Sequence, residues 1–215
     1  MIRVYKQKEV PASLQKENCN KYDDQDVQEV LYDDQLSKCY LCEQDAGKST
    51  QIEHLRPKAE GYFPELKYKW TNLFLACPYC NGRKPNSFML LDPLLHNIED
   101  VIEQRLISGT KKLEFKSDLS GKEVEDTIDL LEKLHNGKNG LRDRKAKAFY
   151  SDVELVVSAF LRLLNNYKEN PTEENKELVN NSLKINKEFL GLKYWMIIDY
   201  GFANDFEDEI VWHKQ

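Results

Sequence analysis

The chain has 215 residues, enough for one medium-sized domain or two small ones with an ordinary hydrophobic core. Hydrophobic residues make up 40% and charged residues 32%, which predicts a soluble globular protein, and no run of 18 apolar residues exists that could span a membrane. The first residues, MIRVYKQKEV, lack the apolar stretch of a signal peptide, so we expect a cytoplasmic protein with no membrane partner.

The net charge of −6 is unevenly distributed along the chain. Residues 38–90 hold eight Lys and Arg against five Asp and Glu, a balance of +3, whereas residues 1–37 carry −3 and residues 91–215 carry −6. This asymmetry is typical of a module that contacts phosphates, attached to a body that does not.

The first part of the chain is predicted to be poor in regular structure. Residues 1–22 are expected to be extended or irregular, and a short helix is expected over residues 26–36, where Val27, Val30 and Leu31 share one face. Between residues 38 and 86 the Pro, Gly and Lys content predicts loops, two short strands and one short helix. The first strand would end at His54, and the second would run from Leu73 to Ala76.

The second part is predicted to be a hairpin followed by helices. Residues 101–115 read as a hairpin that turns at 108–110. Helical spacing then predicts one helix over about 124–135, ended by Gly137, and a long one to about 170. Another helix, with Leu178, Ile185 and Phe189 on its apolar stripe, is expected from Pro171 to Gly191. We therefore divide the chain at residue 95, into segments 1–95 and 96–215.

Four of the five cysteines form two CxxC pairs, which is the sequence pattern of a tetrahedral zinc site. The pairs are Cys39-x2-Cys42 and Cys77-x2-Cys80, separated by 34 residues. Disulfides are not expected in a cytoplasmic chain, and a redox motif would need only one pair in a thioredoxin-like setting. We predict a structural Zn²⁺ that holds together a segment too small to have a core of its own.

The insert between the pairs contains a Glu-His dipeptide in QIEHLRPK and an asparagine in KWTNLFLAC, and a second asparagine follows the last cysteine directly. In this order the motifs CxxC, EHxxP, WxNL and CxxCN resemble the HNH nucleases, in which many members have His at the final position. The resemblance implies an α+β fold: a ββα-metal HNH module stabilised by the four-cysteine zinc site, followed by the hairpin and a mostly helical C-terminal region.

The resemblance also implies roles for single residues. His54 would be the general base, and Asn72 would orient it by tying down backbone. Glu53 and Asn81 would bind the catalytic cation; sparse oxygen ligation suits Mg²⁺, for which Mn²⁺ could substitute. Nucleic acid, DNA by preference with RNA left open, would be steered in by four basic residues: Arg56, Lys58, Arg83 and Lys84.

A closer resemblance extends to about residue 150. The stretches LDPLLHNIEDVI and DTIDLLEKLHNGKNGLRDRKAKAF are similar to the HNH proteins of Septu and retron antiphage systems. Those relatives are encoded with an ABC-type ATPase, so the resemblance implies a defence effector with such a partner. The aromatic-rich C-terminal tail would either dock to that partner or close the protein's own core. Two readings compete with the nuclease: a non-catalytic zinc module that binds nucleic acid or protein, and an ATPase partner whose nuclease site has decayed.

Overall fold

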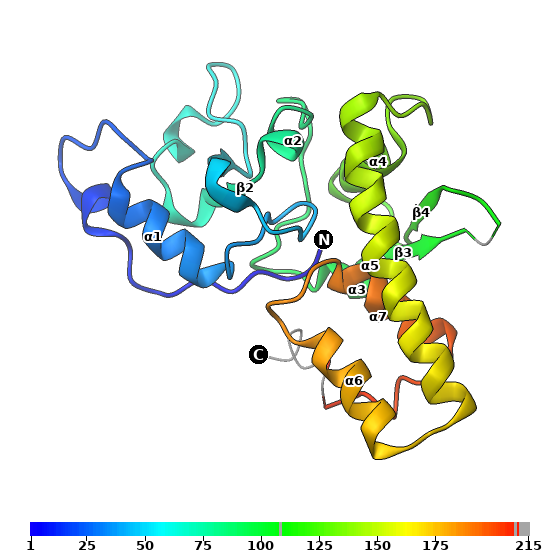
Figure 1. Ribbon diagram of the computed structural model, residues 1–215. Helices are drawn as coiled ribbons and strands as arrows, with labels where there is room; N and C mark the ends of the chain where they lie inside the picture. Colours follow the sequence, from blue (N-terminus) through cyan, green and yellow to red (C-terminus); the bar gives the residue numbers. More distant parts are fainter. Residues whose placement is uncertain (108, 209, 211–215) are drawn as a thin grey trace.

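The computed structural model describes residues 1–107, 109–208 and 210, and shows two small antiparallel sheets among helices (Figure 1). The fold class expected from the sequence is confirmed. Ser108 in the predicted hairpin turn, and Trp212 and His213 in the tail, lie outside the described residues. The helices and strands are α1 (Gln25–Asp34), β1 (Gln51–His54), β2 (Leu73–Ala76), α2 (Pro78–Asn81), α3 (Ile98–Val101), β3 (Glu103–Leu106), β4 (Leu113–Lys116), α4 (Lys122–Asn136), α5 (Arg144–Glu169), α6 (Glu173–Leu183) and α7 (Leu190–Asp199).

The first sheet and α2 form a ββα unit inside the cysteine window. β1 pairs antiparallel with β2, so that His54 lies opposite Leu73 and Gln51 opposite Ala76. All four residues of β2 are buried, as their apolar side chains require, and α2 follows after a single residue, Cys77. The sequence predicted the end of β1 at His54 and both ends of β2 correctly.

The second half contains the hairpin β3–β4 and four of the longer helices. Helix α4 ends before Gly137, whose φ of +80° is a conformation that glycine adopts without strain. The apolar face of α5 is buried along most of its length, at Ala146, Phe149, Tyr150, Val153, Val157, Phe160, Leu164 and Tyr167. These features match the helical spacing in the sequence.

One helix was predicted too long. The sequence suggested a single helix up to Gly191, but α6 ends at Leu183 and a new helix, α7, begins at Leu190. Leu178 and Ile185, expected on the buried stripe, are 46% and 40% exposed. The break has a tertiary cause: the Glu43 carboxylate accepts hydrogen bonds from the backbone N–H groups of Leu190 and Gly191 (2.6 and 3.1 Å) and so fixes a new helix start there.

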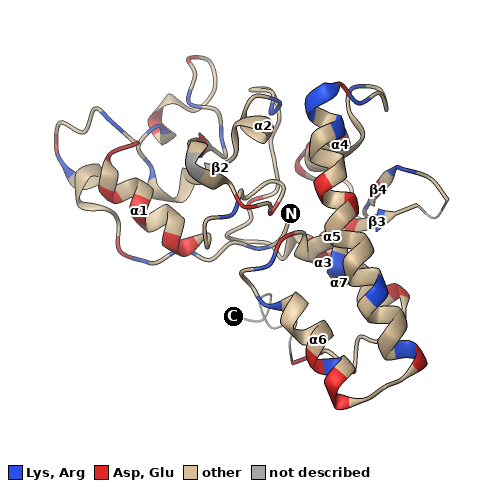
Figure 2. Cartoon of the chain, in the orientation of Figure 1, with Lys and Arg blue, Asp and Glu red and all other residues tan. Residues whose placement is uncertain are grey.

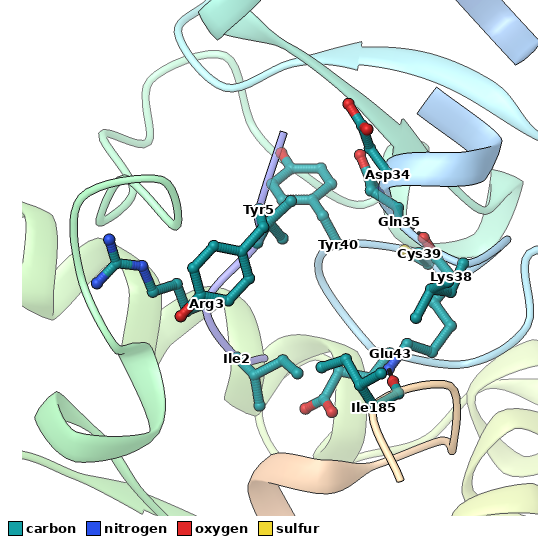
Figure 3. Close-up of a pocket in the computed structure, with 12 residues that line it drawn as sticks. Ile2, Arg3, Tyr5, Asp34, Gln35, Lys38, Cys39, Tyr40, Glu43 and Ile185 are labelled. Atoms are coloured by element: carbon teal, nitrogen blue, oxygen red, sulfur yellow. Dashed lines mark hydrogen bonds between the residues drawn. The ribbon is translucent and has the colours of Figure 1, made fainter. Parts of the chain in front are cut away.

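The N-terminal segment packs between the cysteine window and the C-terminal helices (Figures 1 and 3). The Met1 ammonium pairs with Glu43 (2.7 Å), and the Arg3 N–H donates to the Glu99 carboxylate (3.0 Å). A cavity of about 50 Å³ remains between residues 2–5, Cys39 and Ile185, which is room for about one or two waters. The buried core crosses the predicted boundary at residue 95, because one cluster includes Leu31, Phe74, Ile102 and Leu131.

Part of the described tail belongs to the protein's own core. Ile197 and Phe206 are fully buried and pack with Phe160 and Leu164 of α5. Trp195 donates its indole N–H to the carbonyls of Glu99 (2.9 Å) and Ile102 (3.1 Å). Of the two readings of the tail, the described residues support core closure.

Candidate functional site

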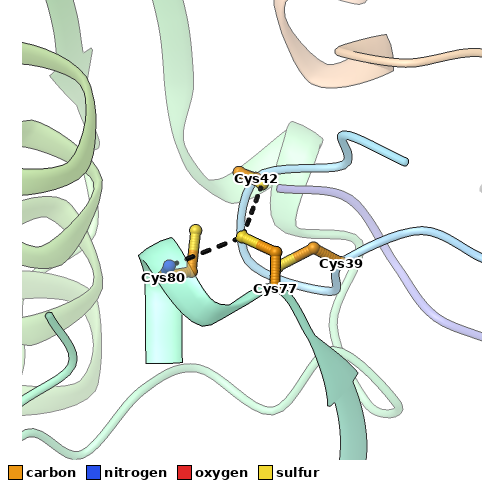
Figure 4. Close-up of side chains that lie close together, drawn as sticks. All are labelled: Cys39, Cys42, Cys77 and Cys80. Atoms are coloured by element: carbon orange, nitrogen blue, oxygen red, sulfur yellow. Dashed lines mark hydrogen bonds between the residues drawn. The ribbon is translucent and has the colours of Figure 1, made fainter. Parts of the chain in front are cut away.

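The four cysteines of the two CxxC pairs come together in one buried cluster (Figure 4). Their sulfur atoms all lie within 4.8 Å of one another, and Cys42 Sγ is 4.0 Å from Cys77 Sγ. Four thiolates around one zinc ion, at Zn–S bonds of about 2.3 Å, stand about 3.8 Å apart. The residues therefore fit a single tetrahedrally coordinated metal ion, and the described cysteines form no disulfide.

Local structure prepares Cys77 of the second pair for this role. Cys77 is the N-cap of α2, and its sulfur accepts the backbone N–H of Cys80 (3.4 Å). The pKa of the Cys77 thiol is lowered, because the thiols of Cys39, Cys42 and Cys80 form hydrogen bonds with its sulfur. A thiolate is the form that binds metal. Because Asn81 follows Cys80 directly in α2, the cluster also fixes the position of Asn81.

His54 ends β1 with its side chain buried and its ring held by two contacts. Its Nε2 lies 2.9 Å from the carbonyl oxygen of Lys67, and its ring meets the Tyr22 ring edge-on at 4.6 Å. Since a carbonyl only accepts, Nε2 must carry the proton, which leaves Nδ1 of the neutral ring with a free lone pair. Burial lowers the pKa of His54 to about 4, and the nearby charges of Lys58 and Lys84 act in the same direction. The imidazole is therefore neutral at pH 7.

Asn72 closes the loop that connects the two strands. Its Oδ1 accepts the backbone N–H of Arg56 (2.7 Å), and its Nδ2 donates to the carbonyls of Arg56 (3.0 Å) and Leu66 (3.2 Å). The side chain is buried. Lys67, whose carbonyl orients His54, comes directly after Leu66, so Asn72 holds the part of the loop on which the His54 ring orientation depends.

Glu53 and Lys84 form a sheltered ion pair beside His54. The Lys84 ammonium lies 2.7 Å from Glu53 Oε1 and donates to the His54 carbonyl at 2.8 Å. The Lys84 side chain is only 2% exposed, and that of Glu53 is 15% exposed. This position favours a role for Lys84 at the Glu53 carboxylate over direct contact with nucleic acid. Glu53 Oε2 makes no hydrogen bond with any other described residue.

Asn81 lies at the end of α2 and donates its Nδ2 to the Gln51 side chain (2.7 Å). A pocket of about 370 Å³ adjoins this bond, lined by Tyr22, Gln51 and Asn81 among others. Tyr22 is also the ring that contacts His54, so it connects the pocket to the imidazole.

The other basic residues predicted to steer nucleic acid have different settings. The Arg56 guanidinium pairs with Glu123 at the start of α4 and donates to the Leu90 carbonyl (2.6 Å). Arg83 pairs with Asp143 (2.6 Å). The Lys58 ammonium lies 3.7 Å from the centre of the Tyr22 ring. Arg56 and Arg83 thus join the module to the second half, and Lys58 stays beside the pocket.

Sequence reasoning missed three contributors to the site. Tyr22 comes from the irregular N-terminal segment, the Lys67 contact uses a backbone carbonyl, and Glu123 lies about 70 residues after His54. Neither a motif nor a spacing marks any of them. Only the three-dimensional structure brings them to His54 and Arg56.

The comparisons with known proteins agree with this geometry. Residues 39–87 match the family model described as HNH endonuclease. The chain is also 30% identical, over 97 residues, to the Septu protein PtuB of Bacillus thuringiensis. That match covers 44% of this chain and 37% of the relative, so the chain is similar to little more than a third of the relative's length. No solved structure matches the chain. Among the described residues, no helix has both the length and the apolar character needed to cross a bilayer. The segment that holds the cysteine cluster, His54 and Asn81 therefore resembles HNH endonucleases both in sequence and in the arrangement of these residues.

Proposed function

We propose that the chain is a metal-dependent endonuclease that hydrolyses phosphodiester bonds of nucleic acid, with DNA as the expected substrate. The observation that carries this proposal is the state of His54: a neutral, buried imidazole whose Nε2–H is bound to a carbonyl and whose Nδ1 is free to take a proton. Hydrolysis of a phosphodiester needs such a base near neutral pH, and the family match of residues 39–87 supports it.

In this proposal each side chain has a separate task. His54 Nδ1 takes the proton from the attacking water, while the Lys67 carbonyl and the Tyr22 ring keep the imidazole from turning. Asn72 acts through backbone, by holding the loop that carries Lys67. Cys39, Cys42, Cys77 and Cys80 hold a structural Zn²⁺, which fixes α2 and with it Asn81.

Glu53 and Asn81 would hold the catalytic cation, Mg²⁺ or Mn²⁺. A carboxylate and an amide oxygen are donors that these hard cations accept. A cation bound there supplies charge stabilisation for the phosphate and for the departing oxygen. Lys84 neutralises Glu53 in this structure, and its ammonium has to share or leave that carboxylate when a cation binds.

The proposed biological role is that of an effector in an antiphage defence system that works with an ABC-type ATPase. It rests on the partial similarity to the Septu protein PtuB, which extends over 97 residues. Ile197 and Phe206 of the tail are buried in the protein's own core, so a docking surface for an ATPase would use other residues.

A second candidate is a non-catalytic zinc module that binds nucleic acid or protein. The Glu53–Lys84 ion pair and the Asn81–Gln51 hydrogen bond favour it, because Glu53 Oε1 and Asn81 Nδ2 already have protein partners that restrain both side chains. In that case neither Mg²⁺ nor His54 would affect any activity of the protein.

Cleavage assays separate the two functions. Wild type, His54→Ala and the control His96→Ala are incubated with supercoiled plasmid, single-stranded DNA and RNA, each with Mg²⁺, with Mn²⁺ and with EDTA. The proposal expects metal-dependent cutting by wild type and by the control, and none by His54→Ala, whose zinc content should equal that of wild type. Equal cutting by all three proteins would refute the role of His54, and no cutting of any substrate by co-purified wild type and ATPase would favour the binding module.

A further inference from the structure

The first two turns of α5 are held against the HNH module by a compact set of side chains. Tyr79 of α2 stacks on Phe149 of α5 at 4.7 Å and donates its hydroxyl to the Leu134 carbonyl of α4 (2.5 Å). The Arg83 guanidinium lies 4.0 Å from the centre of the Tyr79 ring and pairs with Asp143 (2.6 Å). These contacts fix α5 relative to α2.

This docking places the start of α5 close to the proposed cation ligand Asn81. Arg83 is only two residues beyond Asn81, a separation of at most about 7 Å along the chain. Its guanidinium then reaches Asp143, which is the N-cap of α5. Arg144, the first residue of α5, therefore directly follows the residue that is paired with Arg83.

The segment that ends in these two turns has a charge opposite to that of its surroundings. Residues 138–147 contain Lys138, Arg142, Arg144, Lys145 and Lys147 against Asp143, a balance of +4, within a half of the chain that carries −6. Arg142 is used inside the protein, where it lies 3.7 Å from the centre of the Tyr150 ring and donates to the His135 carbonyl. In Figure 2 blue segments gather at the upper end of the long helix, on the same side as α2.

Three of the exposed cations lie on α5 itself and are available for an external partner. Arg144, Lys145 and Lys147 are exposed, while the buried stripe of the same turns consists of Ala146, Phe149 and Tyr150. None of the three makes an ion pair with any residue that the structure describes. By contrast, Arg56, Arg83 and Lys84 of the HNH module are each paired with a carboxylate.

We infer that the exposed cations of α5, Arg144, Lys145 and Lys147, are a second contact for the phosphate backbone of the nucleic acid that enters the HNH site. The inference rests on the proposed nuclease function. The paired cations of the module have little charge left for phosphates, whereas the α5 cations have no carboxylate partner among the described residues. They begin directly after Asp143, the partner of Arg83, and α5 is held against α2 by Tyr79 and Arg83. Phosphate contacts of this kind fix register on the nucleic acid and carry no sequence preference.

The test measures binding without cleavage. In a His54→Ala background, the affinity for a fluorescein-labelled 30-base-pair DNA duplex is measured between 50 and 300 mM NaCl. The test variant carries Arg144→Gln, Lys145→Gln and Lys147→Gln. The matched control carries Arg162→Gln, Lys168→Gln and Lys184→Gln, which remove the same charge from positions farther along the helices. Circular dichroism and zinc content verify that both variants remain folded.

Each phosphate contact contributes about 0.9 to the slope of log affinity against log salt on duplex DNA. We expect the test variant to lose about 2.7 from this slope, and to bind at least tenfold more weakly than its parent at 100 mM NaCl, while the control keeps the parent's slope. A test variant that behaves like the control would overturn the inference and leave the nuclease proposal intact. A His54→Ala parent that binds no DNA, together with a wild type that cuts none, would overturn both.

Discussion

Replacing Asn72 by Ala removes three hydrogen bonds from the loop that orients His54. The change leaves the N–H and the carbonyl of Arg56 without a partner, whereas the Leu66 carbonyl keeps the backbone N–H of Lys69 (3.2 Å). A buried polar group that loses its partner destabilises a protein by about 1 to 3 kcal/mol. Water reaches part of this loop, so we take the lower value for each of these two groups and expect a loss of about 2 kcal/mol in the free energy of unfolding.

Activity should fall as well, because Lys67 follows Leu66 and its carbonyl holds Nε2 of His54. Urea unfolding followed by circular dichroism gives the stability, and hydrogen exchange at the Arg56 amide reports on the loop itself. The control is Asn86→Ala, which replaces an exposed asparagine in the same module. It should change neither the free energy of unfolding nor the hydrogen exchange of the Arg56 amide. Asn72→Asp keeps the shape but sets a carboxylate against two carbonyls, so at pH 8 it should destabilise at least as much as Ala. A loss below about 0.5 kcal/mol, with Arg56 exchange unchanged, would refute this account of Asn72.

Three further predictions concern the metal cluster and two buried titratable groups. Cys77→Ser should abolish zinc binding and unfold residues 38–90, as measured by metal analysis and limited proteolysis; an active, folded variant without zinc would contradict the assignment. The pKa of His54 is about 4, so the imidazole stays neutral as the pH falls below 6.5. The rate of cleavage with saturating Mg²⁺ should therefore not fall to half near pH 6.5, as it would if the base were a histidine of ordinary pKa. Burial raises the pKa of Glu99 to about 7, so this carboxyl destabilises the fold as pH rises from its unfolded value of 4.5 through 7. Glu99→Gln, which keeps an acceptor for the Arg3 N–H, should therefore stabilise by up to about 3 kcal/mol at pH 8 and by little at pH 4.5; an equal effect at both pH values would count against ionisation as the cause.

The elements of the HNH module could be predicted from the sequence because local signals agree there. The apolar run Leu73–Ala76, with Cys77 and Pro78 after it, specifies a buried strand and a short helix over very few residues. The two CxxC pairs likewise predicted a cluster that the fold assembles. In these places the local sequence pattern and the tertiary packing favour the same secondary structure, so the sequence alone is enough to predict it.

What could not be predicted depends on partners distant in sequence. The break between α6 and α7 follows from Glu43, more than 140 residues earlier, and no residue near Phe189 announces it. The basic residues of the insert look alike in sequence, but Lys84 is buried on Glu53 while Arg56 and Arg83 are bound to the second half. Which lysine or arginine is free to meet a phosphate is decided by these pairings.

The first cysteine pair is completed by residues near the other end of the chain, and this has a consequence for synthesis. The Glu43 carboxylate accepts hydrogen bonds from the N–H groups of Leu190 and Gly191. The Lys38 ammonium donates hydrogen bonds to the carbonyls of Ile185 and Lys187 (2.5 and 3.0 Å). At roughly 5 to 20 residues per second, a ribosome needs on the order of ten seconds to make the intervening segment. During that time the loop that contributes Cys39 and Cys42 lacks these contacts. A nascent chain would thus lack the full support of this loop until its last helices emerge, which, under the proposed nuclease function, delays the appearance of the activity inside the cell that makes it.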